Sequence, residues 1–235
     1  MDVNTLLTAL FPDGHNVQVD GVLVHGEGRS SGTTVAVVGT IEATPMGVEV
    51  ALQLAGEVLR VIRDHPGRPI VLLVDTIGQR LSRRDELLGI NRFLGHLAKC
   101  IEAARLRGHR IVSLVYSQAV SGGYLSSGML ADACFALPDA EIRVMGLPAM
   151  ARVTKIPQQR LEELSQSSPV FAPGVSNYLK MGALETLWEG DLASCLVAAL
   201  QAPSSGDRRR ELAEQRGGRE QARRVSRRVR EDALR

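Results

Sequence analysis

Two short runs of small residues carry the chemistry that this sequence suggests. The first follows residues 111–115, an apolar Ile-Val-Ser-Leu-Val run typical of a buried strand, and contains Gly122 and Gly123. We expect the chain to turn sharply here and to continue as a buried helix over residues 125–133. A helix start leaves backbone N–H groups without partners, and glycine lets a ligand approach them closely. The pattern indicates either an anion or oxyanion site or a turn that only packs a strand against a helix.

The second run follows another buried strand. Residues 70–74 are a continuous series of Ile, Val and Leu, typical of a strand that is covered on both faces. Its exit loop, residues 75–79, contains Ile77 and Gly78. Neighbouring parallel strands end at the same edge of a sheet, where open α/β sheets bind their ligands. We therefore expect the two loops to face one cleft, where two sets of amide donors would suit a reaction that forms an enolate.

The elements that would position these loops alternate along the chain. Apolar runs predict strands over residues 22–24, 35–38, 70–74, 111–115, 133–137 and 141–146. Apolar periodicity and composition predict helices over residues 48–63, 83–107, 150–165, 173–182 and 191–200. Residues 1–20 are poorly patterned. Strands separated by helices predict an α/β fold with mostly parallel sheets and crossover connections.

The composition fits one soluble globular domain with an appendage. Of 235 residues, 44% are hydrophobic and 23% are charged, which is enough to build a full core. We expect a domain over residues 1–202 and a tail over residues 203–235. No apolar run approaches the roughly 20 residues of a membrane span, and the N-terminus lacks a secretory pattern. Three widely spaced cysteines predict free thiols in a reducing compartment, so we expect a cytoplasmic protein.

The tail differs from the body in its charge. Residues 203–235 contain 11 arginines and 6 acidic residues, a net charge of +5, whereas the whole chain carries +2. The body is therefore mildly acidic. We expect the tail to be helical or disordered, and to serve either as a solvated end or as a docking segment for an acidic partner such as a carrier protein. It lacks the aromatic residues and motifs typical of nucleic-acid binding.

Several motifs occur in an order that resembles a known family. They are Val-Asp-Thr-Ile-Gly at 74–78, Gly-His-Arg-Ile-Val at 108–112, Val-Ser-Gly-Gly-Tyr at 120–124 and Val-Met-Gly at 144–146. With the long helix after the first motif, this set resembles the carboxyltransferase branch of the crotonase superfamily, whose members act on acyl-CoA and related thioesters. The resemblance covers about residues 20–200. It implies a crotonase-like (ClpP/crotonase) fold, a repeated ββα spiral with mostly parallel sheets flanked by helices.

Within that branch the chain is most similar to the gamma-subunit family of biotin-independent malonate decarboxylases. The resemblance implies that a beta and a gamma subunit, as a heterodimer or higher oligomer, convert malonyl-S-acyl carrier protein to acetyl-S-acyl carrier protein and CO2. No cofactor would be bound covalently to this chain, because the acyl carrier protein subunit supplies a CoA-derived prosthetic arm. We expect no contact with nucleic acid or a membrane.

The resemblance also implies two oxyanion sites in each active site, one from each subunit. The residues implied to be catalytic here are Gly122, Gly123, Ile77 and Gly78. Those expected to bind substrate, and considered as proton donors, are Ser121, Tyr124 and Gln79. No His, Cys and carboxylate cluster has metal-ligand spacing, so we expect no metal site.

Three other functions stay open at this point. A biotin-dependent carboxyltransferase subunit is one alternative, although Ile77 stands where carboxyltransferases often carry proline, which separates this chain from the biotin-dependent enzymes. A non-catalytic scaffold subunit is another. A Clp-like serine protease would use Ser121 as nucleophile, but all five histidines precede Ser121, whereas the histidine follows the nucleophile in that family.

Overall fold

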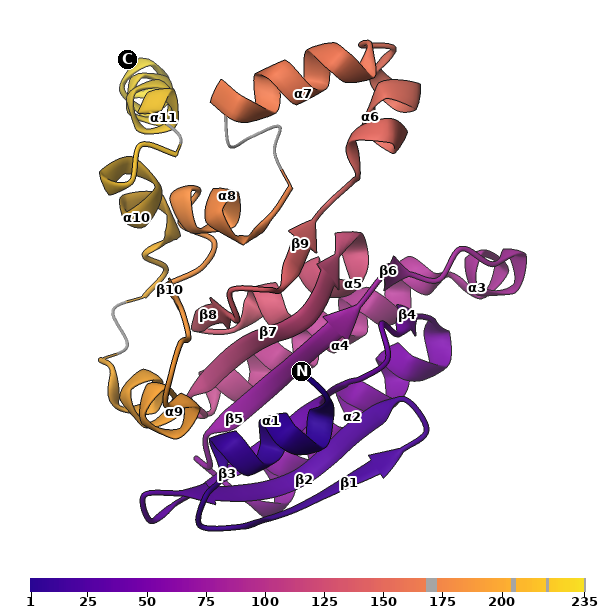
Figure 1. Ribbon diagram of the computed structural model, residues 1–235, viewed down its shortest axis with the longest axis vertical. Coiled ribbons are helices and arrows are strands. Elements are labelled where there is room, and N and C mark those ends of the chain that lie inside the picture. Colours follow the sequence, from indigo (N-terminus) through magenta and orange to yellow (C-terminus); the bar gives the residue numbers. More distant parts are fainter. Residues whose placement is uncertain (168–172, 204–205, 219, 235) are drawn as a thin grey trace.

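A mostly parallel sheet forms the centre of the computed structural model, which describes residues 1–167, 173–203, 206–218 and 220–234 (Figure 1). In spatial order its strands are β1 (His15–Asp20), β2 (Leu23–Ser30), β3 (Thr33–Thr40), β5 (Ile70–Thr76), β7 (Ile111–Val120), β8 (Ala133–Ala136) and β10 (Thr186–Leu187), with β9 (Glu141–Arg143) paired to the end of β7. The pairs β1–β2 and β2–β3 are antiparallel. All later pairs of this sheet are parallel.

Helices cover both faces of this sheet. On one face lie α1 (Val3–Leu10) and α9 (Leu192–Gln201), and on the other α2 (Val48–Asp64) and α4 (Ile90–Leu106). Val71 and Leu73 of β5 pack in the cluster with α1 and α9, whereas Leu72 and Val74 pack in the cluster with α2 and α4. Because successive side chains of a strand point to opposite faces, a strand between two helical layers is apolar at nearly every position. The apolar run at residues 70–74 therefore marks the centre of the sheet.

The N-terminal residues are ordered, although their pattern predicts little. Asp2 caps α1 by accepting hydrogen bonds from the N–H groups of Asn4 and Thr5, both at 3.0 Å. Leu6 and Leu7 of this helix are buried in the core. An eight-residue helix is too short for its apolar period to be distinctive, and packing against the sheet decides its structure.

Three predicted helices are wrong in their extent. The helix predicted over residues 150–165 is divided into α6 (Leu147–Thr154) and α7 (Gln158–Ser167), because the chain leaves the helical conformation at Lys155, whose φ is +62°. The helix predicted over residues 83–107 is interrupted at Gly89, whose φ of +78° ends α3 (Arg83–Leu88) before α4 begins. The helix predicted over residues 125–133 is replaced by α5 (Ser121–Leu125) and a 3₁₀ turn (Gly128–Leu130). The strand before α5 is longer than predicted, because β7 continues to Val120, where it pairs with β9.

The C-terminal third is a series of short helices beside and above the sheet in Figure 1. They are α6 (Leu147–Thr154), α7 (Gln158–Ser167), α8 (Val175–Lys180), α10 (Arg209–Gln215) and α11 (Glu220–Ala233). The tail is joined to the body at Arg216, which donates hydrogen bonds to the carbonyls of Leu179, Leu184 and Glu185. Residues 204, 205, 219 and 235 of the predicted tail lie outside the described residues. A domain boundary at residue 202 stays a prediction.

The end of β5 is held by the carboxylate of Asp75. This buried side chain accepts a hydrogen bond from the N–H of Ala43 at 2.9 Å and another from the N–H of Gln118 at 3.1 Å. Ala43 follows β3 and Gln118 lies in β7, so one carboxylate joins the segments on both sides of β5. The pairing of β5 with β7 shifts register between Val74 and Thr76, at this same point. Asp75 therefore acts as a fixed acceptor that sets where the loop after β5 begins.

Replacing Asp75 with alanine should lower the free energy of unfolding by about 3 kcal/mol, because two backbone N–H groups lose a charged acceptor. Urea unfolding followed by circular dichroism measures this loss. Asp20→Ala, at an exposed position at the end of β1, is the matched control and should change the stability little. Equal stability of the Asp75 and Asp20 variants would contradict the role given to Asp75.

Candidate functional site

The loop after β5 and the start of α5 are in contact. Gly78 and Gln79 form the two-residue strand β6, which pairs in parallel with β4 (Pro45–Met46). Gly78 has φ of +101°, and a Cβ built on it would lie 3.2 Å from both the Cβ of Ser121 and the carbonyl oxygen of Val120. A larger residue would be strained and crowded at this position. Glycine therefore allows the two loops identified in the sequence to meet.

The amides of the two loops have different acceptors. The N–H of Gly78 donates to Oγ1 of Thr76 at 3.1 Å, and that hydroxyl donates to the carbonyl of Thr44 at 2.7 Å. The N–H of Gly122 donates to Oε1 of Gln79 at 3.1 Å. Thr76 is buried, whereas Gln79 is a half-buried, longer side chain that can rotate away. The Gly122 amide is therefore the donor whose acceptor is more easily exchanged for a ligand oxygen.

The two adjacent glycines serve different purposes. A Cβ on Gly123 would lie 2.7 Å from Oγ1 of Thr76, 2.8 Å from Cγ of Met46 and 3.0 Å from the backbone carbon of Gly78. At Gly122 a Cβ would closely approach only Gln79, at 2.9 Å from its Oε1. Gly123 is required for packing of α5 against the loop, and Gly122 leaves space next to an amide donor.

The remaining predicted site residues differ in how far their side chains are exposed to solvent. Ile77 is 48% exposed on the loop, and Ser121 has φ of +49°, a strained conformation for a residue with a side chain. Tyr124 is 1% exposed, and burial raises the pKa of its phenol well above the ordinary value. Its side chain belongs to the same core cluster as Cys134. The structure thus brings Ile77, Gly78, Gln79, Ser121, Gly122 and Gly123 together and directs the side chain of Tyr124 into the core.

An ionic cluster beside the loop was not predicted from the sequence. Arg80 donates to Asp85 and to Glu49, each at 2.7 Å, and Arg84 also pairs with Glu49. Asp85 has no exposed surface, and the Arg80 guanidinium holds the pKa of that carboxyl below its usual value. Glu49 belongs to α2, so the cluster fixes α3 to the body. The run Arg83-Arg84-Asp85-Glu86 contains two of these charges, Arg84 and Asp85, but it does not indicate that they pair with Arg80 and Glu49.

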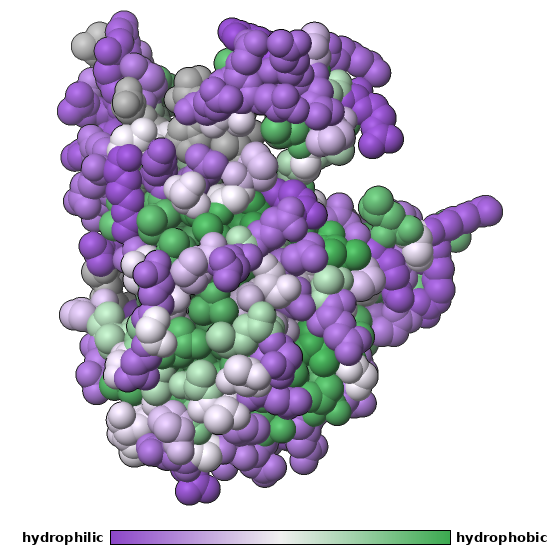
Figure 2. Space-filling view, viewed as in Figure 1, coloured by the Kyte–Doolittle hydropathy of each residue, from purple (hydrophilic) through white to green (hydrophobic). Residues whose placement is uncertain are grey.

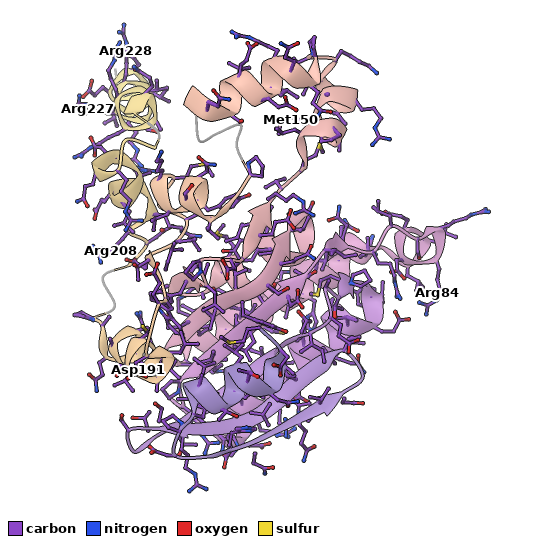
Figure 3. The ribbon with its side chains drawn as sticks, viewed as in Figure 1. Arg84, Met150, Asp191, Arg208, Arg227 and Arg228 are labelled. Atoms are coloured by element: carbon purple, nitrogen blue, oxygen red, sulfur yellow. The ribbon has the colours of Figure 1, made fainter. Side chains whose placement is uncertain are left out.

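Residues 80–89, which we call the α3 arm, extend away from the sheet (Figure 1). Two large apolar side chains of the arm face solvent, since Leu81 is 84% and Leu87 is 78% exposed. Figure 2 shows hydrophobic surface on this arm among hydrophilic side chains, and Figure 3 places Arg84 on it. Exposed apolar surface of this kind marks contact sites between proteins.

Other features of the chain do not add to this site. A cavity of about 330 Å³, lined by Arg110, Phe135 and Trp188 among others, lies at the amino ends of β7 and β8, away from both loops. Among the described residues, no group of three or more His, Cys, Asp or Glu side chains is placed to hold a metal ion. The helices in the described ranges are too short or too polar to cross a membrane.

Comparisons with known proteins point to one family. The family model described as malonate decarboxylase gamma subunit matches residues 41–233. Malonyl-S-ACP:biotin-protein carboxyltransferase MADD of Malonomonas rubra is 33% identical over 196 residues, which cover 74% of this chain and 67% of that protein. These matches extend through both loops.

Solved structures agree with these matches. A Pseudomonas malonate decarboxylase hetero-tetramer in complex with coenzyme A has a chain 26% identical to this one, with a TM-score of 0.79 and 97% of each chain covered. A chain of the Pseudomonas MdcD-MdcE hetero-dimer is 27% identical, with a TM-score of 0.75 and the same coverage. The crotonase-like α/β fold class implied by the motifs is confirmed.

Alanine substitutions should separate the two glycines. Gly123→Ala should lower the free energy of unfolding by about 1–3 kcal/mol, because the new methyl group overlaps the buried Thr76 hydroxyl and backbone. Gly122→Ala should have a much smaller effect, because only the flexible end of Gln79 must move. Thermal unfolding of both variants tests this, and a larger loss for Gly122→Ala would contradict the packing described here.

Proposed function

The chain belongs to the malonate decarboxylase gamma-subunit family, and we propose that its two loops supply one oxyanion site for decarboxylation of a malonyl thioester. It acts as one subunit of a heteromeric lyase. The observation that carries the proposal for the site is the hydrogen bond from the Gly122 N–H to Oε1 of Gln79 at 3.1 Å. It supports the proposal because a carbonyl oxygen already fits against this amide.

The reaction breaks the bond between the carboxylate carbon and the central carbon of the malonyl group. CO2 leaves, the electron pair forms an enolate, and one proton is then added to carbon to give the acetyl thioester. Negative charge develops on the thioester oxygen, and one well-placed N–H donor at such an oxygen is worth about 2.7–4 kcal/mol. The Gly122 amide would donate to the thioester oxygen or to the departing carboxylate. Gly123, Ile77 and Gly78 would shape the same site, with Ser121 and Gln79 beside the substrate.

We further propose that the substrate is carried on an acyl carrier protein, whose CoA-derived arm reaches this loop. The relative from Malonomonas rubra is named for a malonyl-S-ACP substrate. Ile77, which is half-exposed next to Gly78, would contact the apolar part of such an arm. The basic helix α11, which carries Arg227 and Arg228 (Figure 3), suits an acidic carrier. A cytoplasmic location fits the buried thiols of Cys100 and Cys134.

Carboxyl transfer to biotin is the second candidate function. The relative MADD is named as a biotin-protein carboxyltransferase and is 33% identical to this chain. Both reactions pass through the same enolate, so the same amide donor would serve either. The difference lies in whether CO2 is released or is passed to a biotin carrier.

The α3 arm is our candidate contact with the beta-type partner subunit. It continues directly from β6, so a subunit that completes the site at Gly78 and Gln79 would also reach the arm. The pairs from Arg80 to Asp85 and Glu49 hold the arm in place before the partner binds. Preorganised apolar side chains lose little conformational freedom on association, which favours binding.

Reconstitution tests the function. We expect the chain with its beta-type partner, but neither alone, to release CO2 from a malonyl-carrier thioester without biotin. Gly122→Pro, which removes the N–H, should reduce kcat by roughly 100-fold or more in an intact complex. Gly122→Ala keeps the N–H and controls for the added side chain. Full activity of the Gly122→Pro complex would overturn the amide role, and a strict requirement for a biotin carrier would favour the second candidate function.

Substitutions on the arm test the partner contact. Leu81→Asp with Leu87→Asp should weaken assembly with the beta-type subunit by at least about tenfold, because charges would be buried in an apolar contact. Leu106→Asp is the matched control, since Leu106 is also 78% exposed but lies at the end of α4. Analytical ultracentrifugation measures both. Equal assembly of the arm variant and the control would exclude the arm as the contact.

A further inference from the structure

The side chain of Gln79 occupies the position at Gly122 that a substrate oxygen would need. Its Oε1 lies 3.1 Å from the Gly122 nitrogen, and the missing Cβ of Gly122 leaves the space that the carboxamide fills. A neutral amide oxygen therefore satisfies the donor when no substrate is bound. Water is kept from this donor by a group of the chain itself.

The backbone of Gln79 is fixed, whereas its side chain is held only at one end. β6 pairs Gln79 with Met46, and the N–H of Arg80 donates to the Met46 carbonyl at 2.8 Å. Among the described residues, the carboxamide makes one hydrogen bond, through Oε1 to Gly122. The Nε2 group of the carboxamide has no hydrogen-bond acceptor among the described residues. The carboxamide can thus leave the Gly122 amide without breaking any other hydrogen bond of the described structure.

We propose that the Gln79 carboxamide is an exchangeable placeholder for the substrate oxygen. This inference rests on the proposed oxyanion role of Gly122. As the enolate forms, the carboxamide moves aside, and an N–H of its Nε2 group then donates to the oxygen that has replaced its own Oε1. The chemical class of ligand that displaces it is an anionic oxygen, such as an enolate or carboxylate.

The exchange favours the transition state over the bound substrate. A neutral thioester oxygen gains little by replacing an amide oxygen, which is a comparable acceptor. Hydrogen bonds to an ionised oxygen are roughly twice as strong as those between neutral groups. The developing enolate therefore displaces the carboxamide more readily than the ground state does, and only such differential binding raises kcat. Gln79 is in this sense a positioning and selectivity residue.

Charge-changing substitution distinguishes a placeholder from a structural acceptor. Gln79→Glu has nearly the same shape and still accepts a hydrogen bond from Gly122. Its carboxylate, however, is an anion that competes with the substrate oxygen for this amide, and it lacks the NH2 group of the carboxamide. We expect it to lower kcat/KM of the reconstituted complex by roughly 100-fold, and Gln79→Ala to lower it by no more than about tenfold. If Gln79 were only a structural acceptor, we would expect the opposite order, with kcat/KM of the Gln79→Glu complex closer to that of the unsubstituted complex than kcat/KM of the Gln79→Ala complex. Gln18→Glu, on the exposed edge strand β1, is the control for the charge change.

Amide exchange tests the same hydrogen bond without the reaction. In the full chain, hydrogen–deuterium exchange at Gly122 should be faster in Gln79→Ala than in the unsubstituted protein, and should stay slow in Gln79→Glu. Unchanged exchange in Gln79→Ala overturns the placeholder, whatever the activity. If Gly122→Pro is inactive but the glutamate variant is at least as active as the alanine variant, the placeholder is wrong and the oxyanion site stands. If Gly122→Pro is fully active, the oxyanion site itself is wrong.

Discussion

The carboxylate of Asp75 is the constraint on which the site depends. It binds the N–H groups of Ala43 and Gln118 at the point where the pairing of β5 and β7 shifts register. Everything that follows in the loop is positioned from there. The next residue, Thr76, accepts a hydrogen bond from the N–H of Gly78, which has a positive φ and lies against Ser121 at the start of α5. This buried acceptor and the absence of a side chain at Gly78 together allow two loops far apart in the sequence to meet.

The region beyond this constraint combines rigid and movable groups. Gly123 and Thr76 are packed too closely to move, and the ionic cluster of Arg80, Asp85 and Glu49 holds the α3 arm. The Gln79 carboxamide and the exposed apolar side chains of the arm are less restrained. A rigid backbone with an exchangeable acceptor fits catalysis by preorganised donors, because the amide need not be reoriented when charge develops. The exposed arm fits a chain whose site is completed by another subunit.

The central strands and helices can be predicted from local sequence, but the residues at which the elements begin and end cannot. The apolar run at 70–74 and the period at 48–63 identify β5 and α2 because burial dictates composition. Gly89 interrupts the long helix, yet one glycine is tolerated in many helices, so only the positive φ shows that the chain breaks there. The segment 125–133 has small residues where it packs closely, since a Cβ on Gly128 would lie 2.5 Å from Cγ2 of Val74, and its composition resembles that of a buried helix. Tyr124 lies next to the site in sequence, but its side chain is in the core, since adjacent residues of α5 face different sides.

The fold class, the two glycine-containing loops and the family can all be predicted from the sequence, because they depend on composition, order and spacing along the chain. The sequence placed Gly122 and Gly78 at a shared sheet edge through the general rule for parallel strands. The folded chain was needed to show that Gln79 accepts a hydrogen bond from Gly122, that Gly123 is required for packing and that Arg80 bridges α2 and α3. The contacts of Gln79 with Gly122 and of Arg80 with Glu49 join residues more than 30 positions apart. No local sequence pattern specifies a hydrogen bond across such a separation.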